Sequence, residues 1–336
     1  MSKFLILRFS SIGDLVATSP VPRWIKQQIP QAEIHYLVKQ QFASLLEASP
    51  YVDQIHTFDK TTQPLKKILP LLKANQYDWV LDLHKNWRTL QVRQALQQPV
   101  LSFNKLSFQK WLFTQFHIHT LPPIHLAERY LQGLAPLQLQ NDGQGLEHFI
   151  PAAEQIVPAT LDSRLAQQPY VGLVIGAAHA TKRLPTQQLQ QLCAALPDKL
   201  IVLLGGPGDQ AAAAQIQQAG NHVINACGQF SINQSASLVQ QAKVVVAHDT
   251  GLMHIAAAFR RPLVVLWGST HPAFGLFPYL PEAAPVPLHI AQNELTCRPC
   301  TKIGRAHCPK GHFKCMRDLK VANMVLAVEQ QWALED

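Results

Sequence analysis

The sequence predicts an α/β protein built from two consecutive, doubly wound parallel sheets. Short apolar segments typical of buried strands alternate with amphipathic helical segments along the first half of the chain. Residues 151–169 interrupt this alternation and contain Pro151, Pro158 and Pro169. The alternation then restarts at residue 170. Because strands that alternate with helices form parallel sheets covered on both faces, each half is predicted to be one such domain.

The first half contains four predicted strands, each followed by a predicted helix. The strands are the apolar segments 4–9, 33–39, 54–58 and 78–84. Residues 13–29 are predicted to form a turn followed by a helix, and the other helices are the segments 40–49, 64–76 and 86–96. Pro70 predicts a kink in the third helix, because proline removes one backbone donor. These elements predict an N-terminal domain over residues 1–155.

The second half repeats the pattern with five strands. The predicted strands are the segments 170–177, 200–206, 222–228, 243–249 and 262–268. The predicted helices are the segments 186–196, 209–220 and 231–242, the last opened by Ser231 as N-cap, and one starting at Thr250. We therefore predict a linker over 156–169, a C-terminal domain over 170–320 and a C-terminal helix over 321–336.

Composition narrows the class of protein. Of 336 residues, 47% are hydrophobic and only 15% are charged, which predicts a large core rather than disorder. No apolar run reaches the ~18–20 residues that span a membrane, and the apolar N-terminal stretch is too short for a signal peptide. A cytoplasmic protein is expected. The net charge of +8 suits anionic partners, but no pattern typical of a nucleic-acid-binding module is present.

The segment AHDTGLMHIAAA, residues 247–258, joins a predicted strand to a predicted helix. Asp249 ends the strand, Gly251 permits a tight turn, and the helix starts at Thr250. The free amides and positive dipole of a helix N-terminus bind anions, and His254 lies one turn further on. The alternative interpretation is that Asp249 only caps the helix and His254 is a core residue.

The first strand-to-helix turn of the N-terminal half is also polar. Ser10, Ser11, Gly13 and Asp14 cluster where the first strand ends. The three-glycine spacing of a dinucleotide-binding turn is absent. Asp14 is predicted to face a ligand beyond the strand ends, and helix capping by Ser11 or Asp14 is the alternative.

Two further turns lie in the second half. Lys182 and Arg183 follow its first strand, and two such cations suit a diphosphate. Asp209 follows the glycine turn GGPGD, where a carboxylate suits ribose hydroxyls. An exposed basic turn and a plain helix cap are the respective alternatives.

Together these motifs resemble a known family. SSIGDLVATSP, DLHKNWRT, KRLP, LLGGPGD, HDTGLMHIAAA and PLVVLWGST with the cysteine-rich tail are similar to the bacterial lipopolysaccharide heptosyltransferases of glycosyltransferase family 9, especially the heptosyltransferase II type. The resemblance covers nearly the whole chain. It implies a GT-B fold, in which two Rossmann-like domains face a central cleft. It also implies inverting, metal-independent transfer from a nucleotide-diphosphate sugar such as ADP-heptose.

The resemblance also assigns roles to individual residues. Asp14 is the expected catalytic base. The expected donor-binding residues are Lys182, Arg183, Asp209, Asp249, Thr250, Gly251 and His254. The expected acceptor-binding residues are Ser10, Ser11, Gly13, Lys85 and Arg88.

Two positions depart from the family's usual pattern, and they leave the identity of the donor sugar undetermined. Leu184 stands where the family often has Trp, and Asp209 stands where it often has Glu. The alternatives are a family 9 transferase that uses another nucleotide sugar for a different cell-surface glycan, or a non-catalytic protein on this fold that binds nucleotides or nucleic acid.

The resemblance implies a lipid A-anchored core oligosaccharide as acceptor, and therefore a location peripheral to the inner face of the cytoplasmic membrane. Residues 104–120 interleave two lysines with aromatic side chains. Such a segment either lies on an anionic membrane surface or packs as a core helix.

Four cysteines gather near the C-terminus. Cys297, Cys300, Cys308 and Cys315 have the spacing C-x2-C-x7-C-x6-C. A structural zinc site, free thiols and oxidised pairs are three interpretations of this cluster. Because the resemblance implies that catalysis requires no cofactor, any zinc would be structural.

Overall fold

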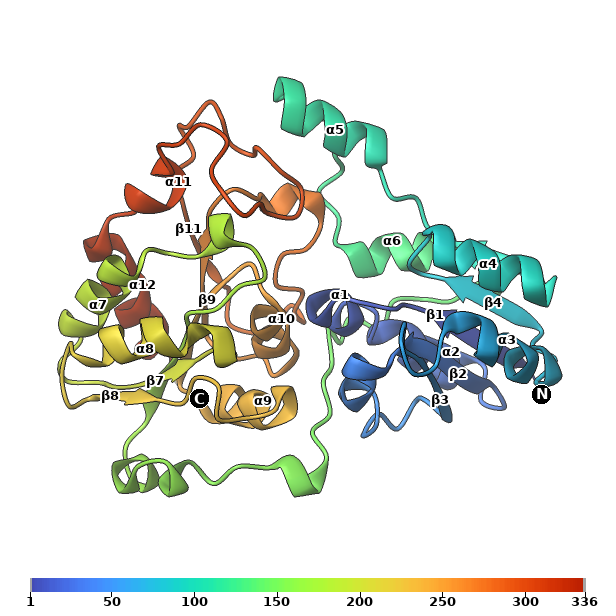
Figure 1. The fold of residues 1–336 in the computed structure, drawn as a ribbon, viewed down its shortest axis with the longest axis horizontal. Helices are drawn as coiled ribbons and strands as arrows, with labels where there is room; N and C mark the ends of the chain where they lie inside the picture. The colour runs from blue at the N-terminus through green and yellow to red at the C-terminus, as the bar shows by residue number, and fades with distance from the viewer. Residues whose placement is uncertain (1, 335–336) are drawn as a thin grey trace. The chain divides into compact units, whose positions relative to one another are not determined.

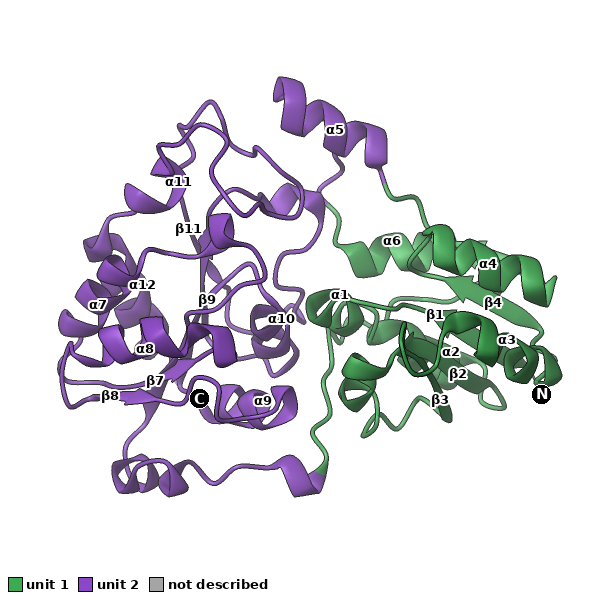
Figure 2. Cartoon of the chain, in the orientation of Figure 1, with its two compact units in different colours: residues 1–105, 124–151 green, residues 106–123, 152–336 purple. Residues whose placement is uncertain are grey.

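The chain folds into two compact units, which Figure 2 colours separately. The computed structural model describes residues 2–334, so the first residue of the predicted N-terminal domain and the last two of the predicted C-terminal helix lie outside the described residues. Unit 1 comprises Met1–Lys105 and Ile124–Pro151, and unit 2 comprises Leu106–Pro123 and Ala152–Asp336. Residues 106–123 thus group with unit 2, although they lie within the first half of the chain.

Unit 1 contains a five-stranded sheet in the order β3-β2-β1-β4-β5, and every neighbouring pair is parallel. Its strands, labelled in part in Figure 1, are β1 (Lys3–Leu7), β2 (Glu33–Lys39), β3 (Gln54–Phe58), β4 (Trp79–Asp82) and β5 (Val100–Ser102). Residues 4–7 of β1 are all buried, as expected for a central strand covered on both faces. The sheet order puts the turns that follow β1 and β4 side by side.

The helices of unit 1 differ locally from the prediction. They are α1 (Ile12–Val16), α2 (Pro20–Gln28), α3 (Leu65–Ala74), α4 (Trp87–Leu96) and α6 (Leu126–Gly133), with 3₁₀ turns η1 (Gln40–Leu45) and η2 (Ala135–Leu137). The turn and helix predicted over 13–29 are two helices, α1 and α2, because Pro20 begins a new helix at its N1 position. The α-helix predicted over 40–49 is a 3₁₀ helix instead.

Unit 2 contains a six-stranded sheet in the order β11-β10-β9-β6-β7-β8, again with only parallel pairs. Its strands are β6 (Tyr170–Val174), β7 (Leu200–Leu204), β8 (Val223–Asn225), β9 (Val244–His248), β10 (Leu263–Trp267) and β11 (Leu288–Ala291). The strand β11 has no counterpart in the prediction. The α/β class with two parallel, doubly wound sheets is confirmed.

The helices of unit 2 follow its strands as predicted, with additions. They are α5 (Ser107–Phe116), α7 (Thr186–Ala194), α8 (Gln210–Gln217), α9 (Ile232–Gln241), α10 (Gly251–Ala258), α11 (Lys314–Arg317) and α12 (Val321–Trp332). Ser231 caps α9 as predicted, since its hydroxyl accepts from Gln234 N at 3.1 Å. Among residues 2–334, no helix combines the length and the apolar character needed to cross a bilayer.

The remaining turns of unit 2 are short 3₁₀ helices. Residues 152–166, which overlap the predicted linker, contain η3 (Ala152–Glu154), η4 (Pro158–Thr160) and η5 (Ser163–Ala166). The others are η6 (Ala180–Lys182), η7 (Pro207–Asp209) and η8 (Pro272–Phe274). Of these, η6 and η7 lie in the turns that follow β6 and β7, and they contain Lys182 and Asp209, two of the predicted donor-binding residues.

Candidate functional site

In unit 1, Asp14 lies in the first turn of α1, directly beyond the end of β1. Its Oδ1 is 2.5 Å from Arg8 Nη2, and its Oδ2 accepts from Ser11 N at 3.0 Å and Ser11 Oγ at 2.9 Å. Burial would raise the pKa of the Asp14 carboxyl, but the Arg8 charge and the Ser11 hydrogen bonds outweigh it and lower the pKa. Asp14 is therefore an ionised carboxylate at neutral pH, which is the protonation state that a general base requires.

Arg8 is the residue that holds this carboxylate in place, and the sequence prediction missed it. Its Nη1 donates to Leu83 O at 2.6 Å and to the Tyr130 hydroxyl at 3.1 Å, and its Nε donates to Ser10 O at 2.9 Å. The residue is 7% exposed. The available signal was a lone arginine in the apolar segment FLILRF, because a buried charge needs a partner.

The predicted acceptor residues of unit 1 come from two adjacent turns. Since β1 pairs with β4, the turn that carries Ser10, Ser11 and Gly13 lies beside the turn that follows β4. Lys85 Nζ donates to Phe103 O at 3.1 Å. Arg88, the last of the predicted acceptor residues, lies in the first turn of α4, and its side chain has no hydrogen-bond or ion-pair partner within residues 2–334. The structure thus brings these residues together at one edge of the sheet.

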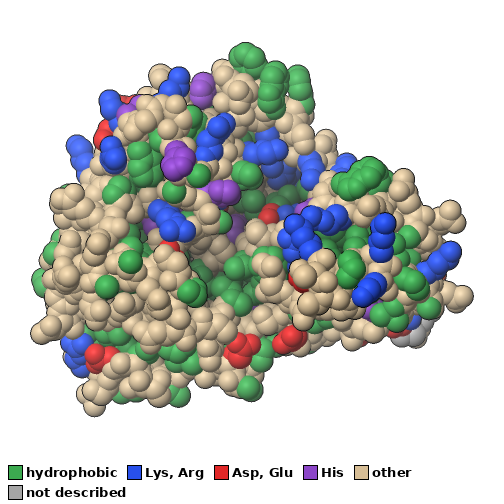
Figure 3. Space-filling model, viewed as in Figure 1, with side chains coloured by type: hydrophobic (Ala, Val, Ile, Leu, Met, Phe, Trp, Pro, Cys, Tyr) green, Lys and Arg blue, Asp and Glu red, His purple; other side chains and the backbone are tan. Residues whose placement is uncertain are grey.

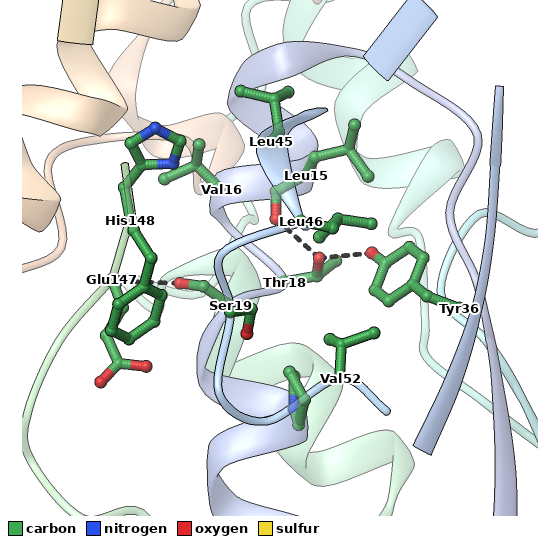
Figure 4. Close-up of a pocket in the computed structure, with 13 residues that line it drawn as sticks. Leu15, Val16, Thr18, Ser19, Tyr36, Leu45, Leu46, Val52, Glu147 and His148 are labelled. Atoms are coloured by element: carbon green, nitrogen blue, oxygen red, sulfur yellow. Dashed lines mark hydrogen bonds between the residues drawn. The ribbon is translucent and has the colours of Figure 1, made fainter. Parts of the chain in front are cut away.

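A small pocket of unit 1 lies against α1. Figure 4 shows Leu15 and Val16 lining it, with the Thr18 hydroxyl bonded to Leu15 O and to the Tyr36 hydroxyl, both at 2.7 Å. It has room for about one water molecule and is lined mainly by apolar atoms. It contains none of the predicted site residues. We interpret it as a packing gap behind α1 rather than a ligand site.

In unit 2, Lys182 and Asp249 meet where β6 and β9 end side by side. Lys182 Nζ is 2.7 Å from Asp249 Oδ2 and also donates to Asp249 O at 3.1 Å. Thr270, which follows β10, donates to the same Oδ2 at 2.8 Å. Asp249 therefore does more than cap a helix: it fixes the Lys182 ammonium beside the turn that opens α10.

The N-terminus of α10 supplies unpaired donors at the same place. The helix begins at Gly251, with Thr250 as an N-cap whose side chain makes no capping bond. Its first amides have no partner within the helix, and the Thr250 hydroxyl is buried without a hydrogen bond. Amides, hydroxyl and ammonium together form a site for an anionic group. His254 is only 2% exposed, so it occupies a core position of α10.

Arg183 and Asp209 form a second pair at the neighbouring strand ends. Arg183 Nη1 is 3.1 Å from Asp209 Oδ1, and Asp209 Oδ2 accepts from Gly206 N at 2.9 Å. A Cβ on residue 176 would lie 2.3 Å from Asp209 Oδ2, so a larger residue in this turn would displace the carboxylate. Arg183 is the exposed partner of this pair, and its guanidinium is the part that a ligand can reach.

The turn that carries Lys182 is tied to two other loops by buried hydroxyls, which the sequence prediction also missed. Thr181 Oγ1 is 2.8 Å from Ser269 Oγ and accepts from Arg305 N at 2.8 Å. Thr181 N donates to Arg305 O at 3.1 Å. Both hydroxyl residues are 2% exposed. The loop that follows Cys300 is thereby fixed to the predicted donor site, and no sequence spacing signals such a long-range contact.

The four C-terminal cysteines are free thiols in the structure. Cys297 Sγ lies 3.7 Å from His312 Nε2, and burial raises the pKa of the Cys315 thiol to about 12. Across residues 2–334, no three Cys, His, Asp or Glu side chains are arranged to hold a metal ion. Structural zinc stays a prediction, which metal analysis of the purified protein tests.

Comparison with known proteins adds an independent line of evidence. Residues 66–306 match the family model for glycosyltransferase family 9 (heptosyltransferase). Lipopolysaccharide heptosyltransferase 1 of Campylobacter coli is 22% identical over 289 residues, covering 80% of this chain and 84% of its own. Lipooligosaccharide heptosyltransferase 2 of Haemophilus ducreyi is 26% identical over 309 residues, covering 81% and 85%.

Solved structures share the fold over the whole chain. A glycosyl transferase family 9 protein from Veillonella parvula has a TM-score of 0.79 at 21% identity, covering 98% of this chain and 97% of its own. The ADP-heptose lps heptosyltransferase II of E. coli has a TM-score of 0.72 at 20% identity, covering 98% of both. The E. coli heptosyltransferase WaaC with ADP-2-deoxy-2-fluoro heptose has 0.66 at 19%, covering 98% and 99%.

Proposed function

The chain belongs to glycosyltransferase family 9, the heptosyltransferase family, and from that premise we propose that it transfers heptose from ADP-heptose to the lipopolysaccharide inner core. Relatives named as lipopolysaccharide heptosyltransferases, and a similar enzyme solved with an ADP-heptose analogue, support this choice of donor and acceptor. The observation that carries the proposal is the Lys182 ammonium, which Asp249 holds at the N-terminus of α10.

In this proposal, unit 2 binds the donor through its diphosphate. The diphosphate accepts from Lys182, from Arg183 and from the free amides at the start of α10. These groups stabilise the charge that builds up on the leaving nucleotide, and because they are held in place beforehand they need little reorganisation. No metal is needed for this stabilisation, since two cations and a helix N-terminus serve the same purpose. Asp209 then contacts the nucleoside, as the sequence resemblance suggests.

Unit 1 supplies the base. The Asp14 carboxylate takes the proton of the acceptor hydroxyl, whose oxygen forms a bond to the anomeric carbon of heptose. The bond between that carbon and the diphosphate oxygen breaks, and its electron pair leaves on ADP. Attack from the face opposite the leaving group inverts the anomeric configuration. The side chain of Arg88, which has no partner among the described residues, is available for an anionic group of the acceptor.

We propose further that the enzyme acts in the cytoplasm, peripheral to the inner face of the cytoplasmic membrane. A core oligosaccharide anchored by lipid A is presented at a membrane surface, whereas a nucleotide sugar is dissolved in the cytoplasm. An enzyme that joins the two works where they meet.

Thermal unfolding with a panel of ligands tests the donor assignment. ADP and ADP-heptose should raise the melting temperature. At 100 times its dissociation constant, a ligand adds about 2.7 kcal/mol to the free energy of unfolding. UDP- and GDP-sugars should raise the melting temperature less. Incubation with ADP-heptose and heptose-deficient core acceptor should release ADP and yield a product of inverted anomeric configuration by NMR. Stronger stabilisation by another nucleotide sugar, with transfer from it, would replace ADP-heptose as the donor.

A further inference from the structure

Helix α5 of unit 2 has one docked face and one exposed face. Phe113 is 7% exposed and packs with Leu121 and Phe274, its ring centroid 5.7 Å from that of Phe274. It also contacts His271, with ring centroids 5.2 Å apart. These contacts attach α5 to the loop that follows β10. They fix which side of the helix faces outward.

The outward side is a continuous aromatic surface. Phe108 stacks on Trp111 with centroids 6.0 Å apart, and Trp111 meets Phe116 edge-on at 5.3 Å. Phe108 is 65%, Trp111 47% and Phe116 59% exposed, and Ile118 just beyond the helix is also exposed. Figure 3 shows apolar side chains at the top of the view, where Figure 1 places α5. Exposed apolar groups gathered in this way mark an interaction surface.

A small basic pocket adjoins this aromatic surface. Its walls are α5, with Ser107, Trp111, Thr114 and Gln115, and the loop 300–305, with Lys302 and Arg305. Its volume of about 230 Å³ is below the ~300–1,000 Å³ typical of pockets for whole ligands. It suits a small anionic head group rather than an entire metabolite. Ile303, exposed between the two cations, adds an apolar side chain at the rim.

The charge of this region is positive and uncompensated. Residues 104–123 and 297–317 contain no Asp or Glu. Within residues 2–334, no carboxylate pairs with the side chains of Lys302 or Arg305. The Arg305 backbone is nevertheless fixed, because it exchanges hydrogen bonds with Thr181. The cations are thus presented from an anchored loop.

We propose that α5 and loop 300–305 form a docking surface for a bilayer of anionic phospholipids. The aromatic side chains enter the interfacial region, where Trp and Phe are favoured, and Lys302 and Arg305 bind lipid phosphates in the pocket. Complementary charge selects this occupant, because the surface is basic and contains no acids. The inference rests on the proposed function, which requires a membrane-anchored acceptor, and it names the surface that meets the membrane.

Vesicle co-sedimentation of the full chain tests the proposal. The protein should sediment with vesicles of phosphatidylcholine mixed with phosphatidylglycerol, and much less with phosphatidylcholine alone. The Lys302→Gln/Arg305→Gln variant should bind the anionic vesicles more weakly by about fivefold per cation removed. The Phe108→Ser/Trp111→Ser variant should lose binding to both vesicle types.

Matched controls separate this surface from general charge and apolarity. Lys66→Gln/Lys67→Gln removes two exposed lysines of α3, and Leu326→Ser removes an apolar side chain of α12 that is 64% exposed. Both variants should sediment like the unchanged protein. The Phe108→Ser/Trp111→Ser variant should keep its melting temperature and its stabilisation by ADP, because neither side chain belongs to the hydrophobic core.

Several outcomes would overturn the proposal. Equal sedimentation of the Phe108→Ser/Trp111→Ser variant and the unchanged protein would show that α5 does not bind the bilayer. Dimerisation that is abolished by Phe108→Ser/Trp111→Ser would assign the face to a second copy of the chain. Displacement by inorganic phosphate, beyond that by chloride of equal ionic strength, would make the pocket a phosphate site.

Transfer to a water-soluble, delipidated acceptor distinguishes this proposal from the proposed function. The Phe108→Ser/Trp111→Ser variant should retain that transfer in full. Absence of transfer by the unchanged protein would count against the function, while vesicle binding would still support the docking surface.

Discussion

Each unit has an ion pair beyond the carboxyl ends of its parallel strands, but the more exposed partner is acidic in unit 1 and basic in unit 2. In unit 1, the Asp14 side chain is 22% exposed and its Arg8 partner only 9%. In unit 2, the Arg183 side chain is 42% exposed and its Asp209 partner only 11%. In unit 1 the arginine of the pair is buried and the Asp14 carboxylate is the more exposed group. In unit 2 the carboxylate of the pair is buried and the Arg183 guanidinium is the more exposed group.

This inversion shows how one architecture serves two chemical roles. Parallel sheets collect their turns at the carboxyl ends of the strands, whatever the turns contain. The buried partner then decides which charge reaches a ligand, and the lower exposure of that partner keeps it in place. Unit 1 is suited to removing a proton, and unit 2 is suited to holding an anion.

The largest expected effect comes from removing the presented carboxylate. Asp14→Asn keeps the size of the side chain but cannot take up a proton, so turnover should fall by about 10²–10⁴-fold. Donor affinity should hardly change, because the proposed function assigns donor binding to unit 2. Steady-state transfer rates and titration with ADP measure the two effects.

Asp142→Asn is the matched control for this experiment. Asp142 also pairs with an arginine of unit 1, since its Oδ2 is 2.6 Å from Arg23 Nε. Its loss should lower the melting temperature and leave turnover intact. Turnover of Asp14→Asn above about a tenth of normal would show that Asp14 is not the base.

Removing the second cation of unit 2, the Lys182 ammonium at the N-terminus of α10, should have the next largest effect. Lys182→Ala deletes a charged donor, and hydrogen bonds to charged groups contribute about 1.5–3 kcal/mol. Donor affinity and turnover should therefore both fall by roughly 10–100-fold, because the cation acts on bound donor and leaving group alike. Isothermal titration with ADP and initial rates measure these changes.

Lys199→Ala provides the comparison. Lys199 is also ion-paired in unit 2, with Asp198 and Glu329, but it precedes β7 and so lies at the opposite edge of the sheet. That variant should lose stability and retain donor affinity. Unchanged ADP binding by Lys182→Ala would place the diphosphate elsewhere.

A smaller effect is expected from the hydroxyl that anchors the Lys182 turn. Thr181→Val keeps the shape of the side chain but leaves Ser269 Oγ and Arg305 N without their partner, which costs about 1–3 kcal/mol. Donor affinity should fall severalfold, because Lys182 is the next residue. Urea unfolding and ADP titration measure the two changes.

Ser237→Ala is the control that distinguishes a loss of Lys182 positioning from a general loss of stability. Ser237 is a fully buried hydroxyl of α9 that accepts from Ile156 N and bonds Gln155 Oε1. That variant should be destabilised to a similar degree and bind ADP normally. If both variants bind ADP alike, Thr181 stabilises the fold without positioning Lys182.

The sequence predicted those features that depend on neighbouring residues. Alternating apolar and amphipathic segments identified nine of the strands, and polar residues at the strand ends located Asp14, Lys182 and Asp249. These signals suffice because strand burial and turn chemistry are local properties. The fold class followed, although no local pattern indicated the short strands β5 and β11.

The missed features depend on contacts between distant segments. Arg8 meets Asp14, Thr270 meets Asp249 and Thr181 meets Arg305 only after the sheets have formed. The position of α5 has the same cause, since Phe113 packs on Phe274 from far along the chain. Sequence spacing contains no information on such pairs, whereas burial of a lone polar group gives a hint that a partner exists.

The smallest predicted effect concerns a feature that the two units share. In each unit, a histidine where one strand ends accepts a backbone amide of the adjacent turn: His84 Nδ1 from Phe9 N at 3.1 Å, and His248 Nε2 from Leu184 N at 2.9 Å. Burial, aided by nearby arginine charge, lowers the pKa to about 3 for His84 and about 4 for His248. Both side chains are therefore neutral acceptors in the folded protein.

These lowered pKa values make the stability depend on pH in a defined direction. Below about pH 6.5 each of these histidines binds a proton in the unfolded chain but stays neutral in the folded chain. The free energy of unfolding therefore falls as the pH drops toward 4. His84→Gln and His248→Gln keep an acceptor but remove the titration, so each should lose less stability between pH 7.5 and about 5 than the unchanged protein. Urea unfolding across that range measures the slopes. Equal reductions in the two variants would show that the units share this histidine contact despite their opposite ion pairs, and unchanged slopes in both would show that neither histidine is held neutral by the fold.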